Sequence, residues 1–206
     1  MIATMQRPLR PVSETGRLEA FSDGVIAIII TIMVLEMHAP ERPSLAALGH
    51  LWPVFLAYAL SFAQVAIYWV NHHHLLDRAE MSTTGLRWAN MFWLFSVSLI
   101  PFGTAWFGDF PGDAVPTAFY LATLLLPAIA YLWLEKEAMC GATRDDGYRA
   151  DHQAERRKTL VSMLLYGAGM VLAFVTTIAS ISCVLGAAML WIVPGSRVDR
   201  WFGAKG

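Results

Sequence analysis

Residues 16–38 read GRLEAFSDGVIAIIITIMVLEMH, and they decide the fold because a polar head passes directly into a long apolar run. The head carries Arg17, Ser22 and Asp23, and the run extends from Gly24 to Leu35. Such a switch from polar to apolar residues is typical of a membrane helix with a functional role at one end.

A helix over these residues gives the apolar run a defined outer stripe. Successive residues on a helix lie about 100° apart. This spacing places five residues on or beside one stripe: Gly24, Ile28, Thr31, Ile32 and Leu35. The hydroxyl of Thr31 is the only side-chain oxygen on this stripe, so the stripe combines apolar side chains with one possible ion ligand.

Asp23 needs a partner, because a carboxylate at bilayer depth costs roughly 2.5 to 3.5 kcal/mol unless it is paired. Arg17 precedes it by six residues, about 240° around a helix, so these two side chains do not face each other on one continuous helix. The partner is therefore expected on another helix. The plainer alternative is that Ser22 or Asp23 only caps the start of the helix.

The pattern Arg17-x-x-x-Phe21-Ser22-Asp23, followed by an apolar run with Thr31, resembles the signature of the prokaryotic relatives of transmembrane protein 175, the lysosomal potassium channel. The resemblance covers roughly the first half of the chain. It continues through Trp69 and the histidines after it, Asn90, and Pro101-Phe102. It implies a tetramer in which the first helix of each subunit lines a central pore, with Ile28 forming the narrowest ring.

Composition places the chain among integral membrane proteins. It has 206 residues, 56% of them hydrophobic, and a mean hydropathy of +0.49. Fifteen Lys and Arg residues balance sixteen Asp and Glu residues, so nothing supports nucleic-acid binding. No nucleophile elbow, phosphate-binding loop or zinc-peptidase pair is present, so we expect no enzyme activity and no cofactor.

The expected fold class is all-α, a single polytopic domain over residues 1–206. Prolines, glycines and charged stretches divide the chain into six membrane helices. Their expected ranges are 17–37, 45–74, 84–107, 115–134, 159–178 and 181–194, joined by a charged connector over 135–158.

Six helices put both termini on one side of the membrane. Fourteen of the fifteen Lys and Arg residues then lie on that side, with Arg42 alone opposite. Under the positive-inside rule this side is the cytosol. We therefore expect a multi-pass protein of the cell inner (plasma) membrane with cytosolic N- and C-termini.

The run Asn71-His72-His73-His74 suggests a metal site at first, but three consecutive histidines point about 100° apart and do not converge on one ion. One histidine is better placed as the partner that Asp23 needs, although the sequence does not settle which of the three takes this role. We expect a structural polar network that comprises Arg17, Phe21, Ser22, Asp23, His73 and Asn90.

These features favour a weakly selective potassium channel. A single stripe cannot enclose an aqueous path alone, so a symmetric oligomer in the lipid bilayer is expected. The resemblance implies that this oligomer is a homotetramer with K⁺ as the permeant ion. Rings of Ile28 and Leu35 would form a hydrophobic gate, and Thr31 would supply hydroxyls between them. No carbonyl filter of the TVGYG type is present.

Two other classes compete with the channel. A small proton-coupled secondary transporter could use Asp23 and a histidine, but no inverted repeat is visible between the two halves of the sequence. A membrane scaffold without transport would have little reason to retain Asp23 in a membrane helix.

Overall fold

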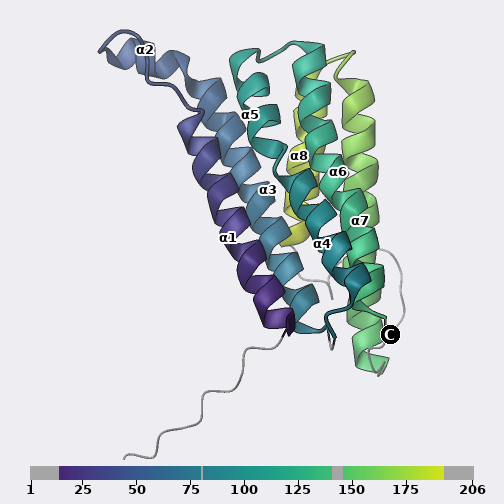
Figure 1. Ribbon diagram of the computed structural model, residues 1–206. Helices are drawn as coiled ribbons and strands as arrows, with labels where there is room; N and C mark the ends of the chain where they lie inside the picture. Colours follow the sequence, from purple (N-terminus) through teal and green to yellow (C-terminus); the bar gives the residue numbers. More distant parts are fainter. Residues whose placement is uncertain (1–13, 80, 141–145, 193–206) are drawn as a thin grey trace, which may run out of the picture.

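The computed structural model describes residues 14–79, 81–140 and 146–192, and every regular element in these residues is a helix. The long helices run side by side as a bundle (Figure 1). The eight helices of the described chain are α1 (Glu14–Leu35), α2 (Leu45–His50), α3 (Trp52–Asp77), α4 (Thr84–Val97), α5 (Ile100–Asp109), α6 (Ala114–Ala138), α7 (Asp146–Leu172) and α8 (Thr177–Ile192).

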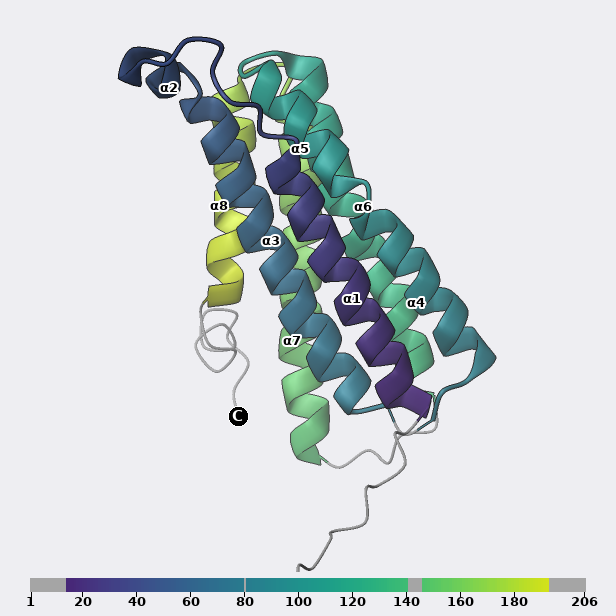
Figure 2. The ribbon, with the colours of Figure 1, turned by 60° about the vertical axis from the view of Figure 1, so that its left-hand side comes forward.

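Helix α1 lies at an edge of the bundle, where it packs on α3, α4 and α5 (Figures 1 and 2). Only one side of α1 is buried within the subunit. The buried residues recur every three or four positions: Leu18, Ser22, Ile26, Ile29 and Met33. The opposite side of α1 is not covered by any described part of the chain.

Two predicted helices are each divided by a proline. The predicted helix 45–74 consists of the short α2 and the long α3, because Pro53 belongs to the first turn of α3. The predicted helix 84–107 consists of α4 and α5, separated by Ser98 and Leu99. Pro101 lies in the first turn of α5, and a proline has no backbone N–H with which to continue the α4 hydrogen bonds.

The second half of the chain differs from the expected boundaries mainly at α7. This helix begins at Asp146 rather than at 159, so much of the expected charged connector is helical. Helices α7 and α8 meet at residues 173–176, whereas the sequence predicted a boundary near 180. No glycine or proline marks this turn, which explains why the sequence pattern placed it too late.

Four stretches of the described chain are long and apolar enough to cross a membrane. They are Glu14–Leu35, Trp52–Asp77, Thr84–Asp109 and Ala114–Ala138. Helix α8 contains a shorter apolar stretch, Thr177–Trp191. The protein is therefore an all-helical, multi-pass membrane protein.

Helices α6, α7 and α8 approach each other closely at Gly169. The Ser180 hydroxyl on α8 donates a hydrogen bond to the Gly169 carbonyl oxygen at 2.8 Å. A Cβ atom at position 169 would overlap the Leu121 side chain and lie 3.2 Å from Cys183 Cβ. At Gly167, two residues earlier, an added Cβ would have no neighbour within 4 Å in the described subunit.

This contrast gives a matched test of the packing. We expect Gly169→Ala to lower the melting temperature of the detergent-solubilised protein, because overpacking of this kind costs about 1 to 3 kcal/mol. Gly167→Ala serves as the control and should leave the melting temperature unchanged or raise it, since alanine favours a helix by about 1 kcal/mol over glycine. Equal effects of the two substitutions would contradict the close contact at Gly169.

Candidate functional site

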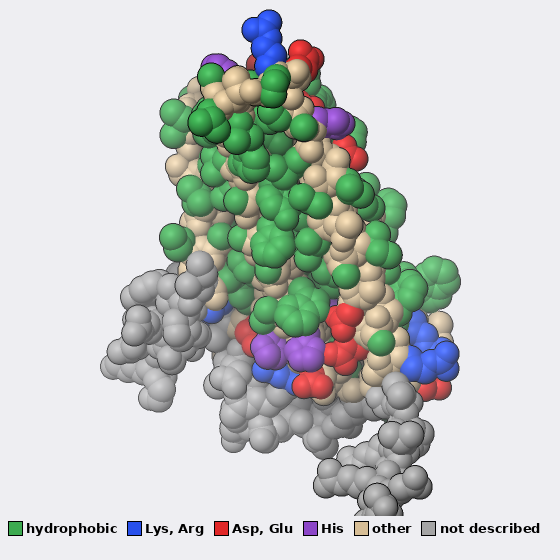
Figure 3. Space-filling view, turned by 90° about the vertical axis from the view of Figure 1, so that its left-hand side faces the viewer, with side chains coloured by type: hydrophobic (Ala, Val, Ile, Leu, Met, Phe, Trp, Pro, Cys, Tyr) green, Lys and Arg blue, Asp and Glu red, His purple; other side chains and the backbone are tan. Residues whose placement is uncertain are grey.

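The uncovered side of α1 carries the stripe predicted from the sequence. Gly24, Ile28, Thr31, Ile32 and Leu35 are all exposed in the subunit, with Ile28 at 60% and Leu35 at 70%. Figure 3 shows the side of the molecule on which α1 and α3 lie, with hydrophobic side chains over most of its length. Such a continuous apolar face on one subunit favours contact with lipid or with further copies of the chain.

The hydroxyl of Thr31 is oriented by its own helix. Thr31 Oγ1 donates a hydrogen bond to the backbone oxygen of Ala27 at 2.9 Å. Because its proton is directed to this carbonyl, the hydroxyl keeps its oxygen lone pairs for other partners. An oxygen of this kind on an exposed face can serve as a ligand for a cation.

Gly24 lies at the start of the same face, and a Cβ added there would meet nothing within 4 Å. Packing inside the subunit therefore gives no reason for a glycine at this position. If a close approach requires Gly24, it involves atoms outside the subunit.

On the buried side of α1, a chain of hydrogen bonds joins three helices. His72 Nε2 on α3 lies 2.6 Å from Asn90 Oδ1 on α4, and Asn90 Nδ2 donates to Ser22 Oγ on α1 at 2.9 Å. Ser22 Oγ in turn donates to the Leu18 carbonyl oxygen at 2.9 Å. The side chains of Ser22, His72 and Asn90 are fully buried.

The direction of this hydrogen-bond chain assigns a proton to His72 Nε2. Asn90 Oδ1 only accepts hydrogen bonds, so His72 Nε2 must carry a proton. His72 Nδ1 is buried and has no hydrogen-bond partner among the described residues. The ring also stacks on Trp93, with 4.4 Å between the ring centroids. His72 therefore serves as a hydrogen-bond donor between α3 and α4.

Two further contacts connect α1 to α3, one helical turn apart. Trp69 Nε1 donates to Asp23 Oδ1 at 2.8 Å, and His73 Nδ1 forms a close hydrogen-bond contact with Glu19 Oε1. Glu19 and Asp23 are four residues apart on α1, as Trp69 and His73 are on α3, so each pair lies on one side of its helix. The rings of Trp69 and His73 stack on each other.

These contacts change the expected polar network in two respects. The histidine that joins Ser22 and Asn90 is His72, whereas His73, expected in that position, pairs with Glu19 instead. The partner of Asp23 is the indole of Trp69 rather than a histidine. The reason is geometric: adjacent histidines point about 100° apart, so only one of them can face α4.

Arg17 and Phe21 lie outside these hydrogen bonds. Both are exposed, and Arg17 forms no ion pair with any described residue. Seven residues separate Arg17 from Gly24, which is nearly two full turns, so Arg17 shares the exposed face of α1. Arg17 and Phe21 therefore do not join the buried polar network in which they were expected.

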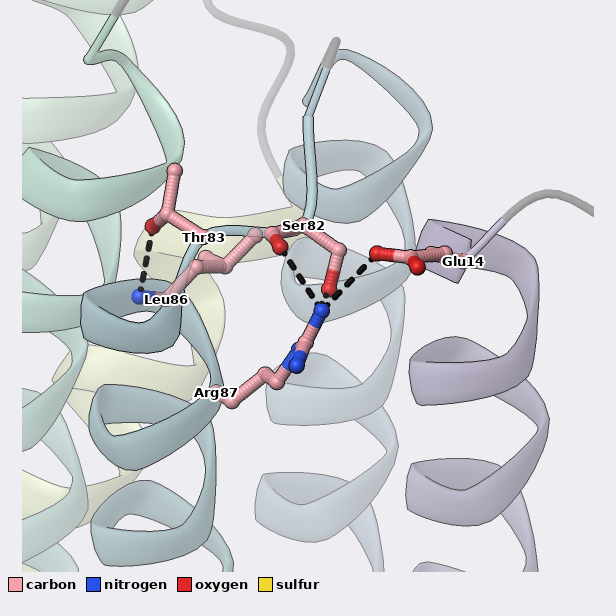
Figure 4. A network of polar contacts seen from close by, with 5 residues as sticks. All are labelled: Glu14, Ser82, Thr83, Leu86 and Arg87. Carbon is pink, nitrogen blue, oxygen red and sulfur yellow. Dashed lines mark hydrogen bonds and ion pairs between the residues drawn. The ribbon is translucent and has the colours of Figure 1, made fainter.

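A separate contact joins the starts of α1 and α4. Arg87 Nη2 donates to Glu14 Oε2 at 2.8 Å and to the Ser82 backbone oxygen at 3.0 Å, and Thr83 Oγ1 caps α4 by accepting from Leu86 N (Figure 4). An open pocket that includes Arg17 and Phe21 lies beside this contact. Because Glu14 is highly exposed, the ion pair contributes little to stability.

Three contacts of the site were not predicted from the sequence. They are the contact of Glu19 with His73, the hydrogen bond from Trp69 to Asp23, and the use of His72 as the histidine that bonds Asn90. The spacing of four residues in both Glu19/Asp23 and Trp69/His73 was the available signal. A search for matching pairs on two neighbouring helices would have found it.

Comparison with known proteins gives a consistent result. Residues 17–101 match the family described as the endosomal/lysosomal potassium channel TMEM175. A potassium channel of Chryseobacterium sp. is 40% identical over 90% of this chain and 96% of its own length. The bovine endosomal/lysosomal proton channel TMEM175 is 29% identical over 86% of this chain, which corresponds to 41% of that protein.

A solved structure is also similar. The crystal structure of a lysosomal potassium-selective channel TMEM175 homolog from Chamaesiphon minutus aligns with a TM-score of 0.77 and 30% sequence identity. The alignment covers 87% of this chain and 96% of that one.

The buried hydrogen-bond chain predicts a specific loss of stability. Asn90→Leu leaves the buried His72 Nε2–H without an acceptor, so we expect a loss of about 1 to 3 kcal/mol, measured as a lower melting temperature in detergent. Ser98→Ala is the control, because Ser98 Oγ bonds only the Phe95 backbone oxygen on an exposed surface. A variant Asn90→Leu as stable as the wild type would contradict the role of this chain.

Proposed function

The chain belongs to the TMEM175 channel family, and we propose that four copies form a potassium channel whose conduction path is lined by the exposed face of α1. Members of this family are ion channels and not enzymes. The observation that carries the proposal is the exposure of Gly24, Ile28, Thr31 and Leu35 along one side of α1 in the isolated subunit.

Six membrane crossings fit both the helices and the charges. Helices α1, α3, α4 with α5, α6, α7 and α8 are the proposed crossings. With this number, both termini lie in the cytosol of a cell whose inner (plasma) membrane holds the channel. The support is the distribution of Lys and Arg, fourteen of which fall on the proposed cytosolic side.

A homotetramer is proposed because one copy leaves the polar atom of Thr31 and the backbone of Gly24 on an otherwise apolar surface. Four copies related by a rotation axis turn the same face of α1 toward a common centre. The open space beside Gly24 supports a close approach by a neighbouring copy or by the permeating ion.

Selectivity is proposed to arise from rings along this axis. Rings of Ile28 and Leu35, with Ile32 beside them, hold water poorly and form constrictions. The hydroxyls of Thr31 lie between these rings, and their lone pairs can replace part of the hydration shell of K⁺. Such a sieve should discriminate K⁺ from Na⁺ less sharply than a carbonyl filter does.

Two alternative functions, a proton-coupled transporter and a proton channel, can be tested by flux measurements. A proton-coupled transporter using Asp23 and a histidine has less support, because Asp23 bonds Trp69 and the carboxylate–histidine pair of the described chain is Glu19–His73. The name of the bovine relative suggests proton conduction as a second candidate. Flux well above about 10³ ions per second per protein would separate a channel from a transporter, and a pH gradient without K⁺ would reveal proton conduction.

Truncating the proposed narrowest ring tests the position of the gate. Ile28→Ala removes methyl groups from all four subunits and should admit water, so we expect a higher conductance and weaker discrimination between K⁺ and Na⁺ in planar bilayers. The control is Ile178→Ala, since Ile178 is exposed on α8 rather than on α1. Unchanged conductance of an assembled Ile28→Ala tetramer would remove Ile28 from the constriction.

Removing the hydroxyl on the stripe tests selectivity. Thr31→Val keeps the shape of the side chain but deletes its oxygen, so we expect a weaker preference for K⁺ over Na⁺. In mixed K⁺ and Na⁺ solutions the reversal potential should shift toward the value of a channel that does not distinguish the two ions. Ser182→Ala is the matched control, because Ser182 Oγ makes the same kind of bond to the Ile178 carbonyl on the exposed face of α8. A Thr31→Val channel with the wild-type reversal potential would exclude Thr31 as a ligand.

A further inference from the structure

A second polar site lies inside the subunit, on the side of α3 that faces α6, α7 and α8. A small cavity lies there, and the centre of a water molecule can occupy about 20 Å³ of it. Gln64 and Tyr68 contribute from α3, Ser162 and Tyr166 from α7, and Trp191 from α8. The cavity takes no part in the proposed conduction path.

Several hydrogen-bonding atoms at this cavity are buried without partners among the described residues. They are both polar atoms of the Gln64 amide and the hydroxyl of Tyr166. Gln64 is 1% exposed and Tyr166 is fully buried. Buried polar groups are almost always paired with protein or with ordered water, because leaving them unpaired is costly.

Two neighbouring hydroxyl groups at the cavity already have hydrogen-bond partners, but each can form a further hydrogen bond. The Tyr68 hydroxyl donates a short hydrogen bond to the Leu124 carbonyl, so its oxygen can still accept. Ser162 Oγ accepts a hydrogen bond from Trp191 Nε1 at 3.1 Å, so its own proton can be donated. The cavity therefore offers both donors and acceptors from two different helices.

We propose that each subunit binds one structural water molecule in this cavity, held by Gln64 of α3 and Tyr166 of α7. A site for one water needs roughly 10 to 15 Å³ and two to four polar partners, and this cavity meets both requirements. The residues that line it include no carboxylate to balance a cation, and the volume excludes a larger organic ligand. The bound water bridges α3 to α7 beside the Tyr68 hydroxyl, which lies near both Gln64 and Tyr166.

A double-mutant cycle in the full-length protein tests this bridge. Gln64→Leu and Tyr166→Phe each remove one partner of the water, so each should lower the melting temperature by roughly 2 to 4 °C. The double variant should fall by about as much as one single variant, because the shared water is already lost after the first substitution. Coupling of this size between Gln64 and Tyr166 is the sign expected of a water molecule that they share.

A dry cavity predicts the opposite result. Both substitutions would then remove unpaired polar groups, so the melting temperature would stay the same or rise, and that outcome would overturn the proposal. Strictly additive losses would also overturn it. Gln64→Leu combined with Thr117→Val is the control cycle and should be additive, because the buried Thr117 hydroxyl bonds the Asp113 carbonyl and does not line the cavity.

An experimental map provides a second measurement. At a resolution that reveals ordered water elsewhere in the bundle, the wild-type protein should show a peak within hydrogen-bonding distance of Gln64 and Tyr166, and Gln64→Leu should lose it. A wild-type map without this peak would overturn the proposal whatever the melting temperatures.

Discussion

The rotation of α1 about its own axis is the constraint on which the rest of the structure depends. Its apolar run contains Ile28, Ile29 and Ile30 in succession, so burial of hydrophobic surface alone hardly distinguishes one rotation from another. The polar contacts make the distinction. Ser22, Asp23 and Glu19 all find their partners on α3 and α4, and with these bonds formed Ile29 faces the bundle while Ile28 faces outward. A rotation by one residue would break the bonds and leave buried groups unpaired.

The two halves of α1 are held by different forces. Near its start, directional hydrogen bonds fix its position against α3 and α4. Toward its end, Ile29 and Met33 are buried by close packing alone. Directional bonds specify one arrangement, whereas apolar packing tolerates small shifts at low cost. The end of α1 that bears Leu35 is therefore held less specifically than the end that bears Ser22.

The sequence predicted the helical fold, the approximate positions of most helices and the exposed face of α1, because these follow from apolar runs, prolines and helical spacing. It predicted that a histidine would partner Asp23 in a network with Ser22 and Asn90, but the indole of Trp69 is the partner of Asp23. Which histidine bonds Asn90 was left open, because three adjacent histidines lie on a helix of unknown rotation. That choice depends on how α3 packs against α4, which is tertiary information. The start of α7 escaped prediction for another reason: charged residues form helices as readily as loops, so charge alone gave no boundary.

Helix α3 carries polar side chains on two sides. Trp69, His72 and His73 contact α1 and α4. Gln64 and Tyr68 lie on the side that faces α6 and α7. This has a consequence for biogenesis. A segment with an amide and three consecutive histidines partitions into lipid less favourably than the apolar α1 does, and its polar groups gain partners only after other helices have arrived. During synthesis α3 would thus remain near the insertion machinery, or paired with α1, until α4 delivers Asn90. Membrane integration of this chain is then a cooperative event among several helices rather than a sequence of independent insertions.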